Sequence, residues 1–207
     1  MEILELSTRS TTVGVVPTPS KGKKMTQTHY NTAFQGMRID EIDKWISFNY
    51  ERLIGSAVFT KNKSFTSKLV CWAEKWRCKE KCFVPSHTGS IIEYDGQIYI
   101  FDMKPLKARI QPLAHYLLNS DEEFALVLRD FMLDTKMFSI NVAEHIGEFY
   151  PYMSAVRSVF TKRQSKWRRH CSELHLRELQ KQGLFLDINS EITPDELLHV
   201  LKGGKNG

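Results

Sequence analysis

The stretch that decides the fold is residues 87–102, HTGSIIEYDGQIYIFD. Two runs rich in β-branched and aromatic residues flank Asp95-Gly96, and Asp-Gly is a preferred dipeptide of the two-residue loop in a β-hairpin. With such a loop, the ladder places Gly89 opposite Asp102. His87 and Asp102 are then diagonal neighbours on one face, with backbones about 7–8 Å apart and side chains within reach of each other. The stretch therefore predicts an antiparallel hairpin that brings a histidine together with a carboxylate.

Patterns on both sides of the hairpin predict further helices and strands. Apolar residues at helical spacing, with acidic residues early in the series, predict a helix that starts after Met37 and ends at Gly55. The other expected elements are strands over 56–60 and 124–128, and helices over 67–81, 135–149, 171–182 and from Pro194 onward. Together these elements indicate the α+β class, with a small antiparallel sheet packed against helices.

The length of 207 residues, of which 42% are hydrophobic, indicates one domain with a real core. Residues 1–36 are rich in Thr, Ser, Gly, Pro and Lys and predict a flexible N-terminal arm, which a protein partner could order. We expect the domain over 37–201 and a disordered tail over 202–207. A net charge of +5 is too small an excess to indicate nucleic acid as a partner.

The sequence carries neither a secretory signal pattern nor an apolar run long enough to span a membrane. We therefore expect a soluble protein, cytoplasmic by default, with association with a virion as the alternative. The four cysteines are too few for a secreted disulfide scaffold of this length, so we expect reduced thiols.

Cys171 stands apart from the other cysteines, 89 residues after Cys82 (171 − 82), and it begins a predicted amphipathic helix. A thiolate at a helix start faces unpaired N–H groups and the positive end of the helix dipole. A nucleophilic thiol also needs a base and a group that orients the base, and His87 and Asp102 supply both. Spacing alone leaves an alternative open, because a single cysteine near a helix start is more often a small buried apolar residue.

Several motifs, taken in order, resemble the permuted papain-like cysteine hydrolases, which are the YiiX-like relatives of the NlpC-type cell-wall peptidases. The motifs are GSAVFT at 55–60, SFTSKL at 64–69, SHTGSII at 86–92, YIFDM at 99–103, RRHCSEL at 168–174 and TPDEL at 193–197. The resemblance covers about residues 50–200 and implies a permuted papain-like fold. It also implies that Cys171 is the nucleophile, His87 the base and Asp102 the orienting acid.

Two departures from the family pattern and one rival acid bear on this site. Ser56 stands where the family usually has Asp, and His170 stands where Tyr is common. Neither departure removes a member of the triad, but with both of them the resemblance does not define the substrate pocket. Glu93 lies on the same strand face as His87, yet six residues at roughly 3.3 Å each place it about 20 Å away. Asp102 is therefore the predicted acid.

The remaining cysteines and one basic run have simpler interpretations. Cys71, Cys78 and Cys82 lie along one helical face, and a zinc site made of these three with His87 would match no common structural pattern. We interpret them as core-facing thiols and expect no metal or cofactor. The run 161–169, with five cations, either binds an anionic partner or forms a solvated face.

By resemblance, the sequence predicts a cysteine peptidase or amidase that cleaves an amide bond through a thioester, in a peptide of the cell-wall type. Backbone amides at the start of the Cys171 helix would stabilise the oxyanion. Two alternatives stay open: an acyltransferase or lipid thioesterase on the same fold, and a catalytically inactive binding or structural module. The expected partner is a peptide or acyl substrate, either neutral or anionic.

Overall fold

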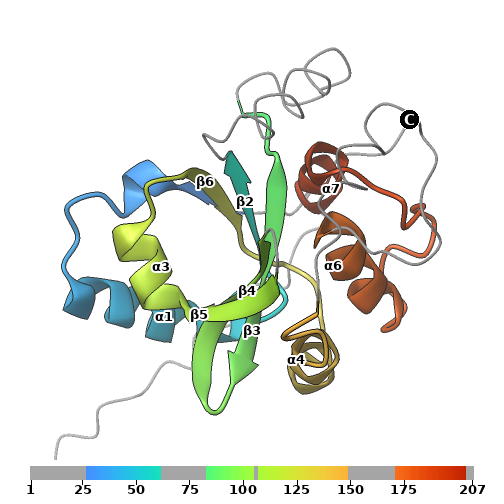
Figure 1. The fold of residues 1–207 in the computed structure, drawn as a ribbon, viewed down its shortest axis with the longest axis horizontal. Helices are drawn as coiled ribbons and strands as arrows, with labels where there is room; N and C mark the ends of the chain where they lie inside the picture. Colours follow the sequence, from blue (N-terminus) through green and yellow to red (C-terminus); the bar gives the residue numbers. More distant parts are fainter. Residues whose placement is uncertain (1–26, 62–82, 105–106, 149–170, 204–207) are drawn as a thin grey trace, which may run out of the picture.

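The fold is organised around one antiparallel sheet, seen in the computed structural model of the chain (Figure 1). The structure describes residues 27–61, 83–104, 107–148 and 171–203. The strand order across the sheet is β1-β6-β2-β3-β4-β5. The strands are β1 Thr28–Tyr30, β2 Ala57–Lys61, β3 His87–Tyr94, β4 Gln97–Lys104, β5 Lys107–Pro112 and β6 Glu123–Val127.

The predicted hairpin is confirmed as β3 and β4, with the predicted register. The recorded pairs run from Tyr94–Gln97 at the turn to Ser90–Phe101, so Gly89 and Asp102 are the next positions along the two strands. Both loop residues have positive φ angles, 50° at Asp95 and 73° at Gly96, as a type I′ turn requires.

Five helices in the described residues cover the two faces of the sheet (Figure 1). They are α1 Ile39–Leu53, α3 Leu113–Asn119, α4 Thr135–Ala143, α6 Cys171–Gln180 and α7 Pro194–Leu201. Helices α1 and α3 lie on one face, and α4, α6 and α7 lie on the other. Strand residues alternate between two buried clusters, so Ile91 packs with the α1 side and Ile92 with the α6 side. The predicted antiparallel sheet packed against helices is confirmed in this mixed α/β fold.

The helix ends follow local signals. Gly183, with a φ angle of 81°, follows α6, and Thr193 caps α7 in a reciprocal capping box with Glu196. By contrast, α4 ends at Ala143 instead of reaching 149. The chain after it turns back because Ala108 of β5 exchanges backbone hydrogen bonds of 2.9 Å with Gly147 and Glu148.

The sequence prediction missed four elements: β1, the short 3-10 helix η1 (Asn31–Ala33), β5 and α3. Strand β1 falls inside the expected arm 1–36, but it pairs antiparallel with β6, so the ordered part of the chain starts before Met37. Pairing with a distant strand orders this short segment, and its own pattern carries no such signal. The arm up to residue 26, the expected helix over 67–81 and the basic run 161–169 lie outside the described residues.

Within the described ranges, no helix has both the length and the apolar character needed to cross a membrane.

Candidate active site

His87 is the first residue of β3, and its side chain meets the carboxylate of Asp102 on the neighbouring strand β4. The distance from His87 Nε2 to Asp102 Oδ1 is 2.5 Å. The two side chains are 19% and 7% exposed, respectively. The diagonal pairing predicted from the hairpin therefore brings these two residues into direct contact.

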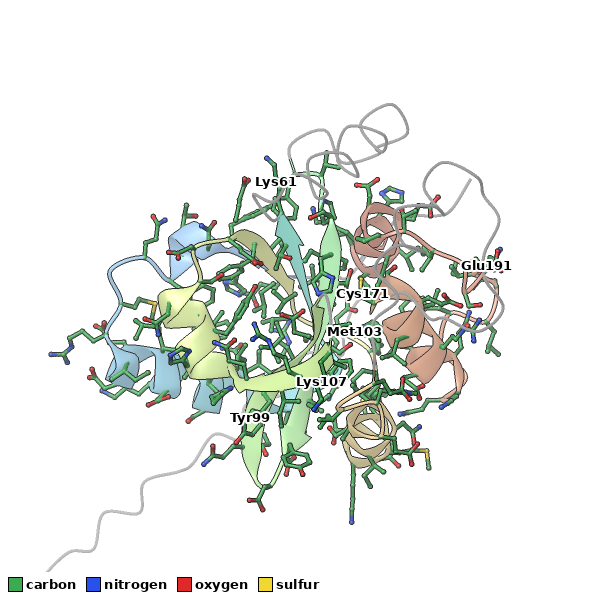
Figure 2. The ribbon with its side chains drawn as sticks, in the orientation of Figure 1. Lys61, Tyr99, Met103, Lys107, Cys171 and Glu191 are labelled. Carbon is green, nitrogen blue, oxygen red and sulfur yellow. The ribbon has the colours of Figure 1, made fainter. Side chains whose placement is uncertain are left out.

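Cys171 is the first residue of α6 and lies at the interface between this helix and the sheet (Figure 2). Its free thiol is buried, with the residue 6% exposed, and it hydrogen-bonds the imidazole of His87. Because Nε2 of His87 faces Asp102, Nδ1 is the ring nitrogen left for the thiol. One imidazole thus joins a carboxylate on one side to a sulfur on the other.

Two backbone N–H groups, from Thr88 and Ser172, also donate hydrogen bonds to the sulfur of Cys171. The Ser172 group belongs to the first turn of α6, where N–H groups have no acceptor within the helix. The Thr88 group is available because the recorded ladder between β3 and β4 stops at Ser90. N–H directions alternate along a strand, and the N–H of Ile91 points to Ser56 on the β2 side. The N–H of Thr88, three residues away, therefore points to the β4 side.

The charge balance of the site favours a thiolate beside an imidazolium. Burial raises the pKa of the Cys171 thiol, but the charge of His87 and the hydrogen bonds from His87, Thr88 and Ser172 outweigh burial and leave this pKa below its ordinary value. Burial likewise lowers the pKa of His87, yet the charges of Cys171 and Asp102, with a hydrogen bond to each, hold it well above the ordinary value. Both shifts act in the direction that favours Cys171⁻ beside His87⁺.

The position of α6 follows from its burial on several sides. Its apolar residues Leu174, Leu176 and Leu179 are buried within the cluster between the sheet and α4, α6 and α7. Ser172 Oγ donates a 2.6 Å hydrogen bond to the carbonyl oxygen of Ile192, which ties the first turn of α6 to the segment that leads into α7. The start of the helix is thereby held against β3.

Glu93, the rival acid, makes a different contact. Its carboxylate accepts a hydrogen bond from the hydroxyl of Tyr50 on α1; together with burial of that hydroxyl, this raises the pKa of Tyr50. Glu93 sits next to the turn of the hairpin, at the far end of β3 from His87. The structure therefore brings Asp102, and not Glu93, to the histidine.

Ser56, which stands where the family that the sequence resembles usually has Asp, contacts backbone groups in this protein. Its hydroxyl donates to the carbonyl oxygen of Arg52 at 2.5 Å and accepts from the N–H of Arg129 at 2.9 Å. These bonds fasten the end of α1 to the segment after β6. His170, the second departure, lies outside the described residues.

In the described part of the chain, no group of three His, Cys, Asp or Glu side chains is placed to hold a metal ion. Cys71, Cys78 and Cys82, the other members of the rejected zinc alternative, lie outside that part. His87 itself is engaged by Asp102 and Cys171.

The sequence predicted N–H donors to the thiol at the start of the Cys171 helix, and Ser172 supplies one. It missed two other contacts at this site, of which the first is the backbone donor Thr88, which carries no side-chain signal beyond its position next to His87. The second contact joins Ser90 on β3 to His175 on α6, with 2.8 Å between Ser90 Oγ and His175 Nδ1.

Comparison with protein-family models finds no match to this chain, and comparison with curated proteins finds none either.

Proposed function

We propose that the protein is a cysteine hydrolase that cleaves an amide bond through a thioester intermediate. The observation that carries the proposal is the imidazole of His87, which contacts Asp102 on one side and the thiol of Cys171 on the other. This is the arrangement that a thiol nucleophile, its base and the orienting acid require. The order His, Asp, Cys along the chain also supports a permuted form of the papain-like fold.

In the first half-reaction, the sulfur of Cys171 attacks the carbonyl carbon of the substrate and forms a carbon–sulfur bond, while the electron pair of the carbonyl moves to oxygen. The N–H groups in the first turn of α6, which have no acceptor within the helix, stabilise this oxyanion. When the oxyanion collapses, the carbon–nitrogen bond breaks and His87 gives its proton to the leaving amine. The acyl group is then held as a thioester on Cys171.

In the second half-reaction, His87 is neutral and takes a proton from a water molecule as that water attacks the thioester. Collapse of the second tetrahedral intermediate breaks the carbon–sulfur bond and releases the carboxylic acid. His87 and Cys171 return to the imidazolium and thiolate forms. Asp102 keeps Nε2 of His87 protonated throughout, so that Nδ1 exchanges protons with the reacting groups.

The substrate that we propose is a peptide of the bacterial cell-wall type, by resemblance to the NlpC-type peptidases. The exposed part of His87 marks the side from which a substrate would reach the buried thiol.

The first test is labelling of the full chain with a thiol-reactive acyl probe, with the modified residue identified by peptide mass spectrometry. The proposal requires labelling at Cys171 that is lost in Cys171→Ala and retained in the matched control Cys82→Ala. Equal labelling at Cys71 or Cys82 in the wild-type chain would contradict it. His87→Ala should also lose most of the labelling near neutral pH, because the thiolate loses its counter-charge.

The second test identifies the reaction. The protein is incubated separately with purified peptidoglycan fragments and with acyl lipids, and mass spectrometry follows the products. Release of a peptide or amine from the fragments, absent in Cys171→Ala, supports the hydrolase. Transfer of an acyl group to an amine would instead establish an acyltransferase, and lipid hydrolysis a thioesterase. An unlabelled Cys171 with no product in either incubation would favour the inactive binding module.

A further inference from the structure

The most unusual buried group outside the proposed triad is the imidazole of His175. The residue is 0% exposed, and its ring packs edge-on against Phe138 of α4, with 5.6 Å between ring centroids. Ser90 Oγ is its hydrogen-bond partner, at Nδ1, whereas Nε2 has no partner among the described residues. A leucine would fill this apolar site without burying a half-satisfied ring. Core packing therefore does not explain the histidine.

The contact between His175 and Ser90 joins α6 to β3 four residues further along the helix than Cys171, which contacts β3 through the imidazole of His87 and the N–H of Thr88. Four helical residues correspond to about 6 Å along the axis at 1.5 Å per residue. On the strand, Thr88 and Ser90 are two residues apart, or about 6.6 Å at 3.3 Å per residue. The two spacings are similar, so one axial setting of the helix on β3 satisfies the contacts of both Cys171 and His175.

Apolar packing alone specifies that setting weakly. The leucines of α6 fit the buried cluster through contacts that have no preferred direction, and such cores tolerate small shifts. A hydrogen bond, in contrast, weakens steeply when its length or angle changes. The hydrogen bond between Ser90 and His175 is thus a directional contact between β3 and α6, whereas the leucine contacts are not directional.

We propose that Ser90 and His175 form a positioning contact, which holds α6 at the setting on β3 that brings the Cys171 sulfur to His87 and to Thr88 N–H. Neither residue touches the reacting atoms. Burial lowers the pKa of His175 to about 4, so the ring stays neutral near neutral pH and its contact with Ser90 is unchanged there. The catalytic consequence of the contact rests on the proposed function, but its effect on the thiol can be measured without a substrate.

The test compares the full chain with Ser90→Ala, His175→Leu and the double variant, together with His175→Asn, whose amide can still reach Ser90. The rate at which iodoacetamide alkylates Cys171 is measured by peptide mass spectrometry across pH 4–10. This rate reports the fraction of Cys171 that is thiolate at each pH. Circular dichroism and urea unfolding report the fold. We expect Ser90→Ala and the double variant to remain folded while the Cys171 pKa rises. A rise of one unit would slow alkylation about tenfold below that pKa. His175→Asn should recover part of the lost rate.

The double variant separates a positioning role from a structural one, because it removes both polar groups from the core. A double variant as stable as the wild type that still alkylates Cys171 slowly supports the positioning role. Folded variants with the wild-type pH profile at Cys171 would overturn it and leave the proposed function standing. A wild-type Cys171 that titrates as an ordinary thiol would overturn the proposed function and this inference with it. If the variants change Cys171 reactivity but no tested substrate is hydrolysed, the inference is supported and the hydrolase proposal alone is weakened.

Discussion

Replacing Asp102 with asparagine changes the charge beside His87 and leaves the shape of the side chain almost intact. The 2.5 Å contact with Nε2 is a charge-assisted hydrogen bond with its carboxylate 7% exposed, so solvent screens it little. Such bonds contribute about 1.5–3 kcal/mol, against about 0.5–1.5 kcal/mol for neutral ones. An asparagine that still accepts from Nε2–H should therefore cost the imidazolium about 1–1.5 kcal/mol, which lowers the His87 pKa by about one unit.

The sign of the effect on activity follows from the two pKa values. The reactive pair Cys171⁻ and His87⁺ exists above the lowered pKa of the thiol and below the raised pKa of the imidazole. Asp102→Asn should move the alkaline limit of this range down by about one unit, because the imidazolium loses its anionic partner. Asp102→Ala, which removes the hydrogen bond as well, should move it by about one to two units.

The assay is titration of histidine side chains by NMR in protein labelled at histidine. The other six of the seven histidines serve as internal controls, and Glu93→Gln is the matched control for loss of one carboxylate on the hairpin. We expect a lower His87 pKa in both Asp102 variants and no change in Glu93→Gln. An unchanged His87 pKa in both Asp102 variants, or an equal fall in Glu93→Gln, would refute the assignment of Asp102 as the orienting acid.

Three further predictions concern stability. Because burial lowers the folded-state pKa of His175 to about 4, the unfolded chain binds the extra proton first, and stability should fall as pH drops below 6.5. Urea unfolding should show His175→Leu losing about 1.5 kcal/mol less than wild type between pH 6.5 and pH 5, and equal losses would contradict the shift. A Cβ at Gly89 would lie 2.8 Å from Ile100 Cδ1, so Gly89→Ala should cost about 1–2 kcal/mol in urea unfolding. Adding Ile100→Val, which removes Cδ1 but keeps Cγ1 at 2.9 Å from that Cβ, should restore part of the loss; no restoration would place the strain at Cγ1 or at the carbonyl oxygen of Phe101. Thr193→Ala removes the cap on the N–H of Glu196 and should cost about 1 kcal/mol by thermal unfolding, whereas Thr193→Ser should cost little.

The elements that could be predicted from the sequence are those that carry their own local signal. Asp95-Gly96 fixes the hairpin and its register, and the cap at Thr193 with Pro194 fixes the start of α7. Strands β1 and β5 carry no comparable signal, because β1 has three residues and β5, KARIQP, has one β-branched residue; each pairs with a neighbouring strand. Helix α3 has seven residues, too few for a helical period to stand out.

The candidate site likewise contains one contact that could be predicted from a local signal and others that could not. The meeting of His87 and Asp102 follows from one hairpin and could be predicted from its register. The approach of Cys171 could not, because 84 residues (171 − 87) separate it from His87 and spacing says nothing about how α6 packs on β3. That expectation came from the resemblance to a family. The contact between Ser90 and His175 depends on the same packing and carries no sequence motif.

The end of the hairpin explains how one histidine meets both an acid and a thiol. Beyond Ser90 and Phe101 the recorded pairing of β3 with β4 stops, while β3 stays paired with β2 and β4 stays paired with β5. In a continued ladder, the N–H of Thr88 would donate to β4 and would not be available as a donor to the sulfur. Because the ladder stops, that N–H is available to Cys171, and the thiol can approach from the start of α6. Asp102, one position past the last pair, remains close enough to hold His87. The same break in pairing therefore supplies the donor to the sulfur and the geometry of the acid, which is why the three residues meet at this end of the sheet.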